Sequence, residues 1–205
     1  MKVKICGITN QQDATLAVEL GVDALGFIFA KSPRQVDPQK ALSIITSLPP
    51  FIKTLGVFVN EDPSKIQEIV AFCGLDIIQF HGDEAPGVCR NFMPRSVKAF
   101  QLRDESTLGQ VKPYQGKVRA MLFDTYAQEK RGGTGKIFDW RLAVEGKSFG
   151  IPIILSGGLS PFNIKEAITT VKPYAVDVNS GIEESPGKKD YVLMKQLFEV
   201  IQSLK

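Results

Sequence analysis

Ile153-Ile154-Leu155-Ser156-Gly157-Gly158-Leu159-Ser160-Pro161 is the stretch that decides how this chain folds. The apolar run stops at two glycines and is followed by Ser160 and Pro161, residue types that favour the start of a helix, so we expect a buried strand that leads directly into a helix. The helix should present one apolar face, at i, i+3, i+4 and i+7, formed by Ile164, Ala167, Ile168 and Val171. Glycines and free N–H groups at such a junction favour a phosphate, which predicts an anion site.

A second stretch repeats this arrangement further along the chain. Tyr174-Ala175-Val176-Asp177-Val178-Asn179-Ser180-Gly181 is again an apolar run that ends in small polar residues and glycine. Two such ends lying side by side would form a phosphate cradle from backbone N–H groups.

Short apolar runs rich in Val, Ile and Phe alternate with amphipathic stretches along the whole chain, with no linker between them. The runs lie at residues 3–6, 24–29, 55–59, 77–80, 97–100, 120–124, 152–156 and 175–178. Asp37-Pro38 and Asp62-Pro63 supply a cap and a first-turn proline for two of the intervening helices. The helices around residues 106–111 and 138–143 have weaker periodicity. This alternation is typical of an α/β protein with a parallel sheet.

About eight continuous apolar strands in one domain are best accommodated by a single-domain (β/α)8 barrel spanning residues 1–205. The alternative is a doubly wound open sheet, which would normally carry its glycine-rich phosphate turn after the first strand. Here the glycine-rich candidates follow the last two runs, where barrels often bind phosphate with the help of a short extra helix. We expect that extra helix at residues 181–185.

The overall composition excludes several classes of protein. The 205 residues are 43% hydrophobic and 23% charged, as in a soluble single domain, and the net charge of +3 is too small to indicate nucleic-acid binding. No leader-like or membrane-spanning apolar segment is present, which predicts a cytoplasmic protein without a membrane partner. Three cysteines argue against disulfides, and one histidine argues against a metal site.

Catalytic candidates are the polar residues at the carboxyl ends of the strands, because those ends form the mouth of a barrel. Cys6 ends the first run, where nearby helix N-termini would stabilise a thiolate that could act as nucleophile or general base. Asp124 abruptly ends a buried run, where a carboxylate is costly unless it is hydrogen-bonded or used. The first and sixth strands lie well apart around an eight-stranded ring, so Cys6 and Asp124 would face each other across the mouth as base and acid.

Other polar positions have competing interpretations. His81 could contact substrate or be structural, and Arg34 could pair with a carboxylate or be solvated. Cys73 and Cys89 complete apolar helical faces, so both should be buried and inert. Lys188 and Lys189 are interpreted as solvated charges. Residues 132–136, Gly-Gly-Thr-Gly-Lys, lack the spacing of a nucleotide-binding P-loop and fit a lid over the mouth or a plain surface loop.

Several strings of the sequence, taken together, resemble the phosphoribosylanthranilate isomerase family along the whole chain. They are Lys4-Ile5-Cys6-Gly7-Ile8-Thr9, Gly56-Val57-Phe58-Val59-Asn60, Gln79-Phe80-His81-Gly82, Leu122-Phe123-Asp124-Thr125, Gly132-Gly133-Thr134-Gly135-Lys136, Leu155-Ser156-Gly157-Gly158-Leu159 and Val176-Asp177-Val178-Asn179-Ser180-Gly181-Ile182-Glu183. Two departures from the family pattern are Asn179, where a small residue such as serine is expected, and the loop at residues 31–35.

The resemblance implies an Amadori rearrangement in tryptophan biosynthesis, without metal or organic cofactor. Asp124 would protonate the furanose ring oxygen and Cys6 would remove the C2 proton of the phosphosugar substrate. The resemblance also implies phosphate binding near Gly157, Gly158, Ser180 and Gly181 and the anthranilate carboxylate near Arg34. His81 and Asp177 are further substrate-binding candidates because they lie at strand ends. The protein would be a monomer or a homodimer.

Two other functions compete with the isomerase. One is a different phosphosugar barrel, such as an epimerase or a tryptophan synthase α subunit. Epimerases of that kind usually hold a metal through histidines. The other is a catalytically inactive phosphate-binding barrel, which would be stabilised by phosphosugar but show no turnover.

Overall fold

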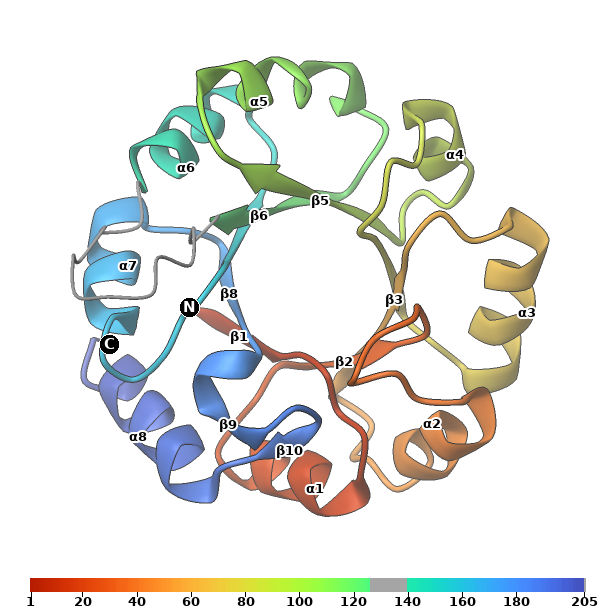
Figure 1. Ribbon diagram of the computed structural model, residues 1–205, viewed down its shortest axis with the longest axis vertical. Coiled ribbons are helices and arrows are strands. Elements are labelled where there is room, and N and C mark those ends of the chain that lie inside the picture. Colours follow the sequence, from red (N-terminus) through yellow and green to blue (C-terminus); the bar gives the residue numbers. More distant parts are fainter. Residues whose placement is uncertain (126–139, 205) are drawn as a thin grey trace.

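A computed structural model describes residues 1–125 and 140–204, and it places the eight predicted apolar runs in one closed parallel barrel (Figure 1). Each strand pairs with the next along the chain, and the last pairs with the first, where Lys4 is the register partner of Asp177. The strands are β1 (Lys2–Ile5), β2 (Ala24–Ile28), β3 (Lys53–Phe58), β4 (Ile77–Phe80), β5 (Ser96–Leu102), β6 (Ala120–Thr125), β7 (Ile153–Ser156) and β8 (Ala175–Val178). The predicted barrel is therefore confirmed, and the doubly wound alternative is wrong.

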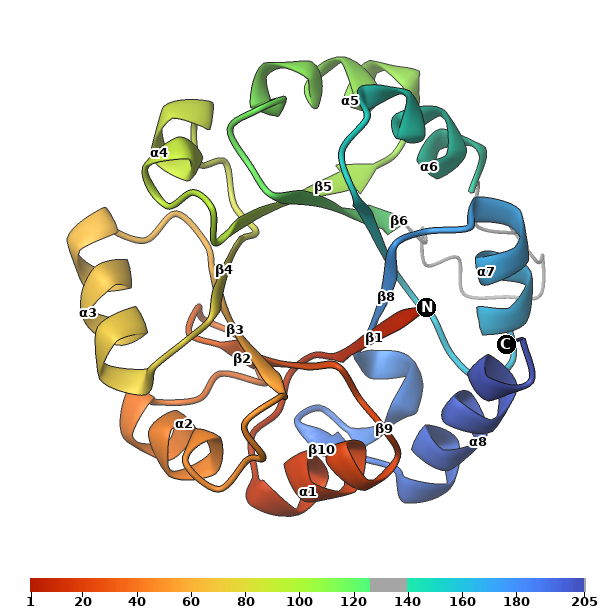
Figure 2. The same cartoon turned by 180° about the vertical axis from the view of Figure 1, so that it is seen from behind.

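Helices surround this ring, as both views along the barrel axis show (Figures 1 and 2). They are α1 (Gln11–Glu19), α2 (Pro38–Ile45), α3 (Pro63–Cys73), α4 (Pro86–Asn91), α5 (Glu105–Gly109), α6 (Arg141–Glu145), α7 (Ile164–Val171) and α8 (Tyr191–Gln202). Asp37 and Asp62 cap α2 and α3 as predicted, accepting hydrogen bonds from the backbone N–H groups of Lys40 and Ser64. The helices with weak periodicity, α5 and α6, span five residues each.

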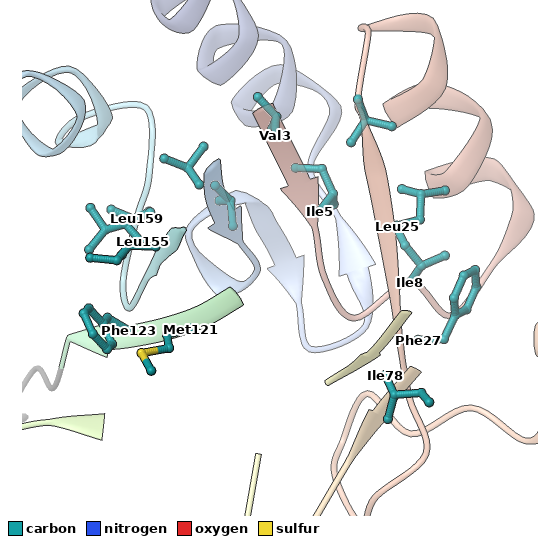
Figure 3. Close-up of a cluster of buried hydrophobic side chains, with 14 of the residues drawn as sticks. Val3, Ile5, Ile8, Leu25, Phe27, Ile78, Met121, Phe123, Leu155 and Leu159 are labelled. Atoms are coloured by element: carbon teal, nitrogen blue, oxygen red, sulfur yellow. The ribbon is translucent and has the colours of Figure 1, made fainter. Parts of the chain in front are cut away.

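Side chains alternate along each strand between the barrel interior and the helices, because successive residues of a strand point to opposite faces. The outward set packs against the helices and includes Ile5, Leu25, Ile78, Phe123 and Leu155 (Figure 3). The inward set forms a smaller apolar cluster on the amino-terminal side of the interior, made of Val97, Ala99, Ala120, Leu122, Ile154 and Ala175. The alternation leaves Cys6, His81 and Asp124 facing inward above that cluster.

Two segments near the phosphate-site candidates differ from their predictions. α7 begins at Ile164, with Asn163 as its N-cap residue, instead of directly after Ser160. The side chain of Asn163 accepts a hydrogen bond from Ser160 N–H at 2.8 Å and donates one to the Gly158 carbonyl at 3.0 Å, and these bonds hold a turn before the helix.

The predicted extra helix at residues 181–185 is only partly present. The 3-10 helix η3 (Ser180–Ile182) is followed by β9 (Glu183–Ser185), which pairs antiparallel with β10 (Lys188–Lys189). This hairpin lies beside α1 in both views, and the N–H of Lys189 is bonded to the α1 residue Asp13 (Figures 1 and 2). Residues 183–185 are extended because the hairpin supplies their backbone partners. The predicted lid at residues 132–136 lies outside the described residues.

Candidate active site

A cavity of about 350 Å³ opens where the strands end at their carboxyl termini, the end at which barrels carry their function. Its walls come from the loops after β1, β2, β7 and β8 and from inward residues at the carboxyl ends of β3, β4 and β6. The predicted site residues that line it are Cys6, His81, Asp124, Gly157, Gly158, Asp177, Ser180 and Gly181. The structure therefore brings together every predicted site residue except Arg34.

The loops after β7 and β8 form a tight backbone junction on one side of the cavity. Gly157 and Gly158 have φ of 97° and 60°, a conformation that favours glycine. A Cβ atom at Gly181 would lie 2.0 Å from the carbonyl oxygen of Leu159, so only glycine fits there. Bare backbone at three positions next to the Ser180 side chain makes this junction suitable for a phosphate.

Asp124 is the penultimate residue of β6 and lies half-buried at the cavity wall, and no lysine or arginine of residues 1–125 and 140–204 forms an ion pair with it. Burial raises the pKa of its carboxyl group to about 6, and the negative charge of Asp177 adds to the rise. Within the described part of the chain, Asp124 forms its ion-pair contact with His81, whose Nε2 lies 3.8 Å from Asp124 Oδ2. A carboxyl group with this pKa retains a protonated fraction near neutral pH, as a general acid requires.

Cys6 lies on the β1 side of the same cavity and is buried. Burial raises the pKa of its thiol, and the positive charge of Lys4 is the largest influence that opposes the rise. Cys6 Sγ and Lys4 Cε both lie 2.9 Å from the point where a Cβ atom at Gly26 would be, so Gly26 makes room for the two side chains to approach. Lys4, two residues before Cys6, is a thiolate-stabilising group that the sequence pattern did not indicate.

Lys4, Gln79 and Asp177 form a buried polar layer directly below Cys6 and His81. Lys4 Nζ donates to Asp177 Oδ2 at 2.7 Å and to Gln79 Oε1 at 2.9 Å. All three side chains are less than 5% exposed. Lys4 and Gln79 are not among the site residues predicted from the sequence. Each lies two residues before a predicted site residue, and strand alternation would have placed both on the inward face.

Arg34, in the loop after β2, is held by a carboxylate of the protein itself. Its Nε donates to both carboxylate oxygens of Glu183 at 2.9 and 3.0 Å, and its Nη2 donates to Oε2 at 2.6 Å. Lys189 Nζ lies 3.0 Å from Glu183 Oε1 and also donates to Asn179. The prediction of a solvated Lys189 is therefore wrong, because its side chain is fully buried and its ammonium group is hydrogen-bonded to these acceptors. Lys188 is exposed, as expected. Cys73 and Cys89 are buried, as predicted.

A glycine-rich backbone junction on one wall, with a thiol and a carboxyl group on others, is the arrangement typical of an acid–base enzyme of the phosphosugar-binding (β/α)8-barrel class. A family model described as N-(5'phosphoribosyl)anthranilate (PRA) isomerase matches residues 3–200. The chain belongs to this isomerase family.

Individual relatives agree with this assignment. N-(5'-phosphoribosyl)anthranilate isomerase from Geobacter sulfurreducens is 49% identical over 197 residues, 96% of each chain. The phosphoribosyl anthranilate isomerase structure from Thermotoga maritima is 41% identical over 99% of both chains, with a TM-score of 0.91. A second isomerase structure, in complex with reduced 1-(o-carboxyphenylamino)-1-deoxyribulose 5-phosphate, is 38% identical over 99% of both chains (TM-score 0.89). A third shows monomers generated from the dimeric Thermotoga maritima isomerase, 37% identical over 98% of both chains (TM-score 0.87).

Proposed function

We propose that the protein converts N-(5-phosphoribosyl)anthranilate to 1-(2-carboxyphenylamino)-1-deoxyribulose 5-phosphate, an Amadori rearrangement in tryptophan biosynthesis. The observation that carries the proposal is the shared cavity. It presents a thiol from β1 and a carboxyl group from β6, with a glycine junction suited to phosphate beside them. A family relative binds the reduced form of this product. The reaction rearranges the substrate without net oxidation, so the two proton-transferring side chains account for it without a cofactor.

Asp124 acts as the general acid and Cys6 as the general base. Asp124 gives its proton to the ring oxygen, which breaks the C1–O bond and leaves a Schiff base between C1 and the anthranilate nitrogen. The Cys6 thiolate then takes the proton from C2, and the electron pair of that C–H bond moves to give an enolamine. Protonation at C1 and loss of the hydroxyl proton at C2 produce the ketone. Each proton removed is matched by one supplied, so the substrate is only rearranged.

The pKa values of Asp124 and Cys6 determine what fraction of the enzyme is in the protonation state that the mechanism requires. Asp124 has a pKa of about 6, and the pKa of the Cys6 thiol lies above its usual value. The productive form, with Asp124 protonated and Cys6 ionised, is therefore a minor species at neutral pH. The cation of Lys4 increases its population by favouring the thiolate.

The substrate would be held at two ends. Backbone N–H groups of Gly157, Gly158 and Gly181, together with Ser180, would bind the phosphate. Arg34, already oriented by Glu183, would bind the anthranilate carboxylate. Asp177 and His81 would contact the part of the substrate between these ends, which keeps the reacting carbons within reach of Cys6 and Asp124.

The proposal is tested by following the loss of anthranilate-substrate fluorescence with wild type, Cys6→Ser and Asp124→Asn. Each substitution should lower kcat by about 10²–10⁴-fold, the usual contribution of a general acid or base. Cys73→Ser, in α3, and Asp83→Asn, in an exposed loop position, are matched controls that should retain activity. Near-full activity of Cys6→Ser or Asp124→Asn would contradict the mechanism. A wild-type protein that shows no turnover but is stabilised by phosphosugar would favour a phosphate-binding barrel without catalysis.

The assembly and location of the protein are also part of this proposal. A homodimer is favoured because one relative is described as dimeric and because Phe51 and Tyr174 are 92% and 60% exposed at the amino-terminal end of the barrel. No helix among the described residues is long and apolar enough to cross a membrane. We expect a cytoplasmic enzyme whose partner is the small phosphosugar and not a nucleic acid. Analytical ultracentrifugation measures the molar mass in solution, and a mass equal to that of one chain at micromolar concentration would contradict the dimer.

A further inference from the structure

Gln79 is a buried side chain that connects the polar layer inside the barrel to the only histidine of the chain. It lies in β4 two residues before His81, so both side chains face the interior. Its Oε1 is 2.9 Å from Lys4 Nζ, and its Nε2 is 3.0 Å from His81 Nδ1. The amide therefore has one hydrogen-bonding partner at each end.

The chemistry of the partners fixes the orientation of this amide. A lysine ammonium group has only donors, so the atom of Gln79 that faces Lys4 must be the carbonyl oxygen. The atom that faces His81 is then the NH₂ group, which also has only donors. His81 Nδ1 must accept this hydrogen bond and cannot carry a proton. Neutral His81 consequently holds its proton on Nε2.

The same contact disfavours the imidazolium form of His81. A proton on Nδ1 would face the NH₂ group of Gln79, two donors at 3.0 Å. Burial and the charge of Lys4 act in the same direction, since both lower the pKa of His81. Two independent features, the amide contact and the buried cation, therefore keep the ring neutral.

The neutral ring matters because its Nε2 lies 3.8 Å from Asp124 Oδ2. An imidazolium at this distance would stabilise the Asp124 carboxylate and lower its pKa by about 1–3 units, which would remove the proton that a general acid donates. A neutral Nε2–H leaves that proton in place. It is also a donor on the correct side of the ring to stabilise the carboxylate after the proton has gone to the substrate.

We propose that Gln79, oriented by Lys4, is a positioning residue that holds His81 as the neutral Nε2–H tautomer and thereby preserves Asp124 as the general acid. The catalytic part of this inference rests on the proposed function. The tautomer itself does not, because it follows from the contacts among Lys4, Gln79 and His81. Gln79 acts through its neighbour, since its oxygen accepts from Lys4 and its NH₂ group donates to His81.

The tautomer can be measured in the wild-type protein by long-range ¹H–¹⁵N NMR after labelling histidine with ¹⁵N. The chain has one histidine, so its ring signals need no assignment. At pH 7.5 we expect a protonated-type shift for Nε2 and an unprotonated-type shift for Nδ1. An Nδ1–H tautomer or an imidazolium spectrum in wild type would overturn the proposal without any substitution being made.

Gln79→Glu tests the consequence for catalysis, with Gln67→Glu on the exposed face of α3 as a control of the same chemistry. A glutamate carboxylate only accepts hydrogen bonds, so His81 should acquire a proton on Nδ1. The resulting loss of protonated Asp124 should lower kcat at pH 7.5 by at least about tenfold, with a smaller change in KM, while the control remains unchanged. Unchanged His81 signals or an unchanged kcat in Gln79→Glu would overturn the proposal. Absence of turnover in wild type would count against the isomerase function, and the NMR spectrum would still decide the tautomer.

Discussion

Asp124 and Asp177 are two carboxylates that face the same cavity in opposite electrostatic environments. Asp177 is 4% exposed and lies 2.7 Å from the Lys4 ammonium group. Asp124 is less buried and has no lysine or arginine partner among the residues that the structure describes, and its pKa is raised to about 6, in part by the charge of Asp177 itself. The more deeply buried group is the one that has an ion-pair partner.

This difference separates an ion-paired carboxylate from the proposed general acid. Burial of an ion is tolerated where a partner of opposite charge compensates for the lost hydration, as at Asp177. At Asp124 the lost hydration is not compensated, and the cost appears as a proton held more tightly. Stability would be improved by giving Asp124 a cation, but the general acid would then be lost. Variants that remove Lys4, Asp177 or Asp124 test whether the two carboxylates differ in this way.

The largest expected effect comes from breaking the buried pair. Lys4→Met leaves the Asp177 carboxylate buried beside Gln79 without its ammonium partner, and removal of one member of a buried pair costs about 3–5 kcal/mol. The free energy of unfolding, measured by urea denaturation at pH 7.5, should fall by that amount. The double variant Lys4→Met, Asp177→Leu should recover part of the loss, because no unpaired charge remains.

The chain contains a matched control for this measurement. Lys53 and Asp76 also lie 2.7 Å apart, but their side chains are 59% and 32% exposed. Lys53→Met should therefore change the free energy of unfolding by less than about 1 kcal/mol. Equal losses for Lys4→Met and Lys53→Met would show that burial does not distinguish the two pairs.

A smaller effect of opposite sign is expected at Asp124. Asp124→Asn removes the carboxylate whose ionisation is unfavourable in the folded protein, so the variant should be more stable than wild type at pH 8, by about 3 kcal/mol for a rise in pKa from 3.8 to about 6. For a chain of this length the midpoint of thermal unfolding should rise by about 6–12 °C. Calorimetry of both proteins from pH 4 to pH 8 provides the measurement.

The sign follows from proton binding. Asp124 binds its proton more tightly in the folded state, with a pKa of about 6, than in the unfolded state, whose ordinary value is 3.8. Between these values the folded state carries more protons, so wild type loses stability as the pH rises through this window. The advantage of Asp124→Asn should consequently shrink as the pH falls from 6 to 4. A variant less stable than wild type at pH 8 would contradict an uncompensated carboxylate.

The sequence was sufficient for the parts of this site that depend on strand ends. Cys6 and Asp124 were found because each polar residue ends an apolar run, and barrel topology then places them at one mouth. The partners Lys4 and Gln79 were missed because they lie inside the runs, although alternation with Cys6 and His81 identifies their inward face. Lys189 could not be placed from sequence, because its burial depends on acceptors at Asn179 and Glu183 that the β9–β10 hairpin brings to it.

The smallest effect that tests the difference between Asp124 and Asp177 is a change in the pH at which Asp124 titrates in the ligand-free protein. Its side-chain ¹³C carboxyl signal, identified by its absence in Asp124→Asn, should titrate with a midpoint near pH 6 because burial and Asp177 both disfavour the charged form. Since activity requires the protonated acid together with the Cys6 thiolate, turnover should fall about tenfold for each pH unit below this midpoint. Asp177→Asn, which removes one of the two causes, should move the midpoint of Asp124 toward lower pH. A midpoint near 4 in wild type would mean that burial and the charge of Asp177 do not raise the pKa of Asp124 and so do not prepare it as the acid.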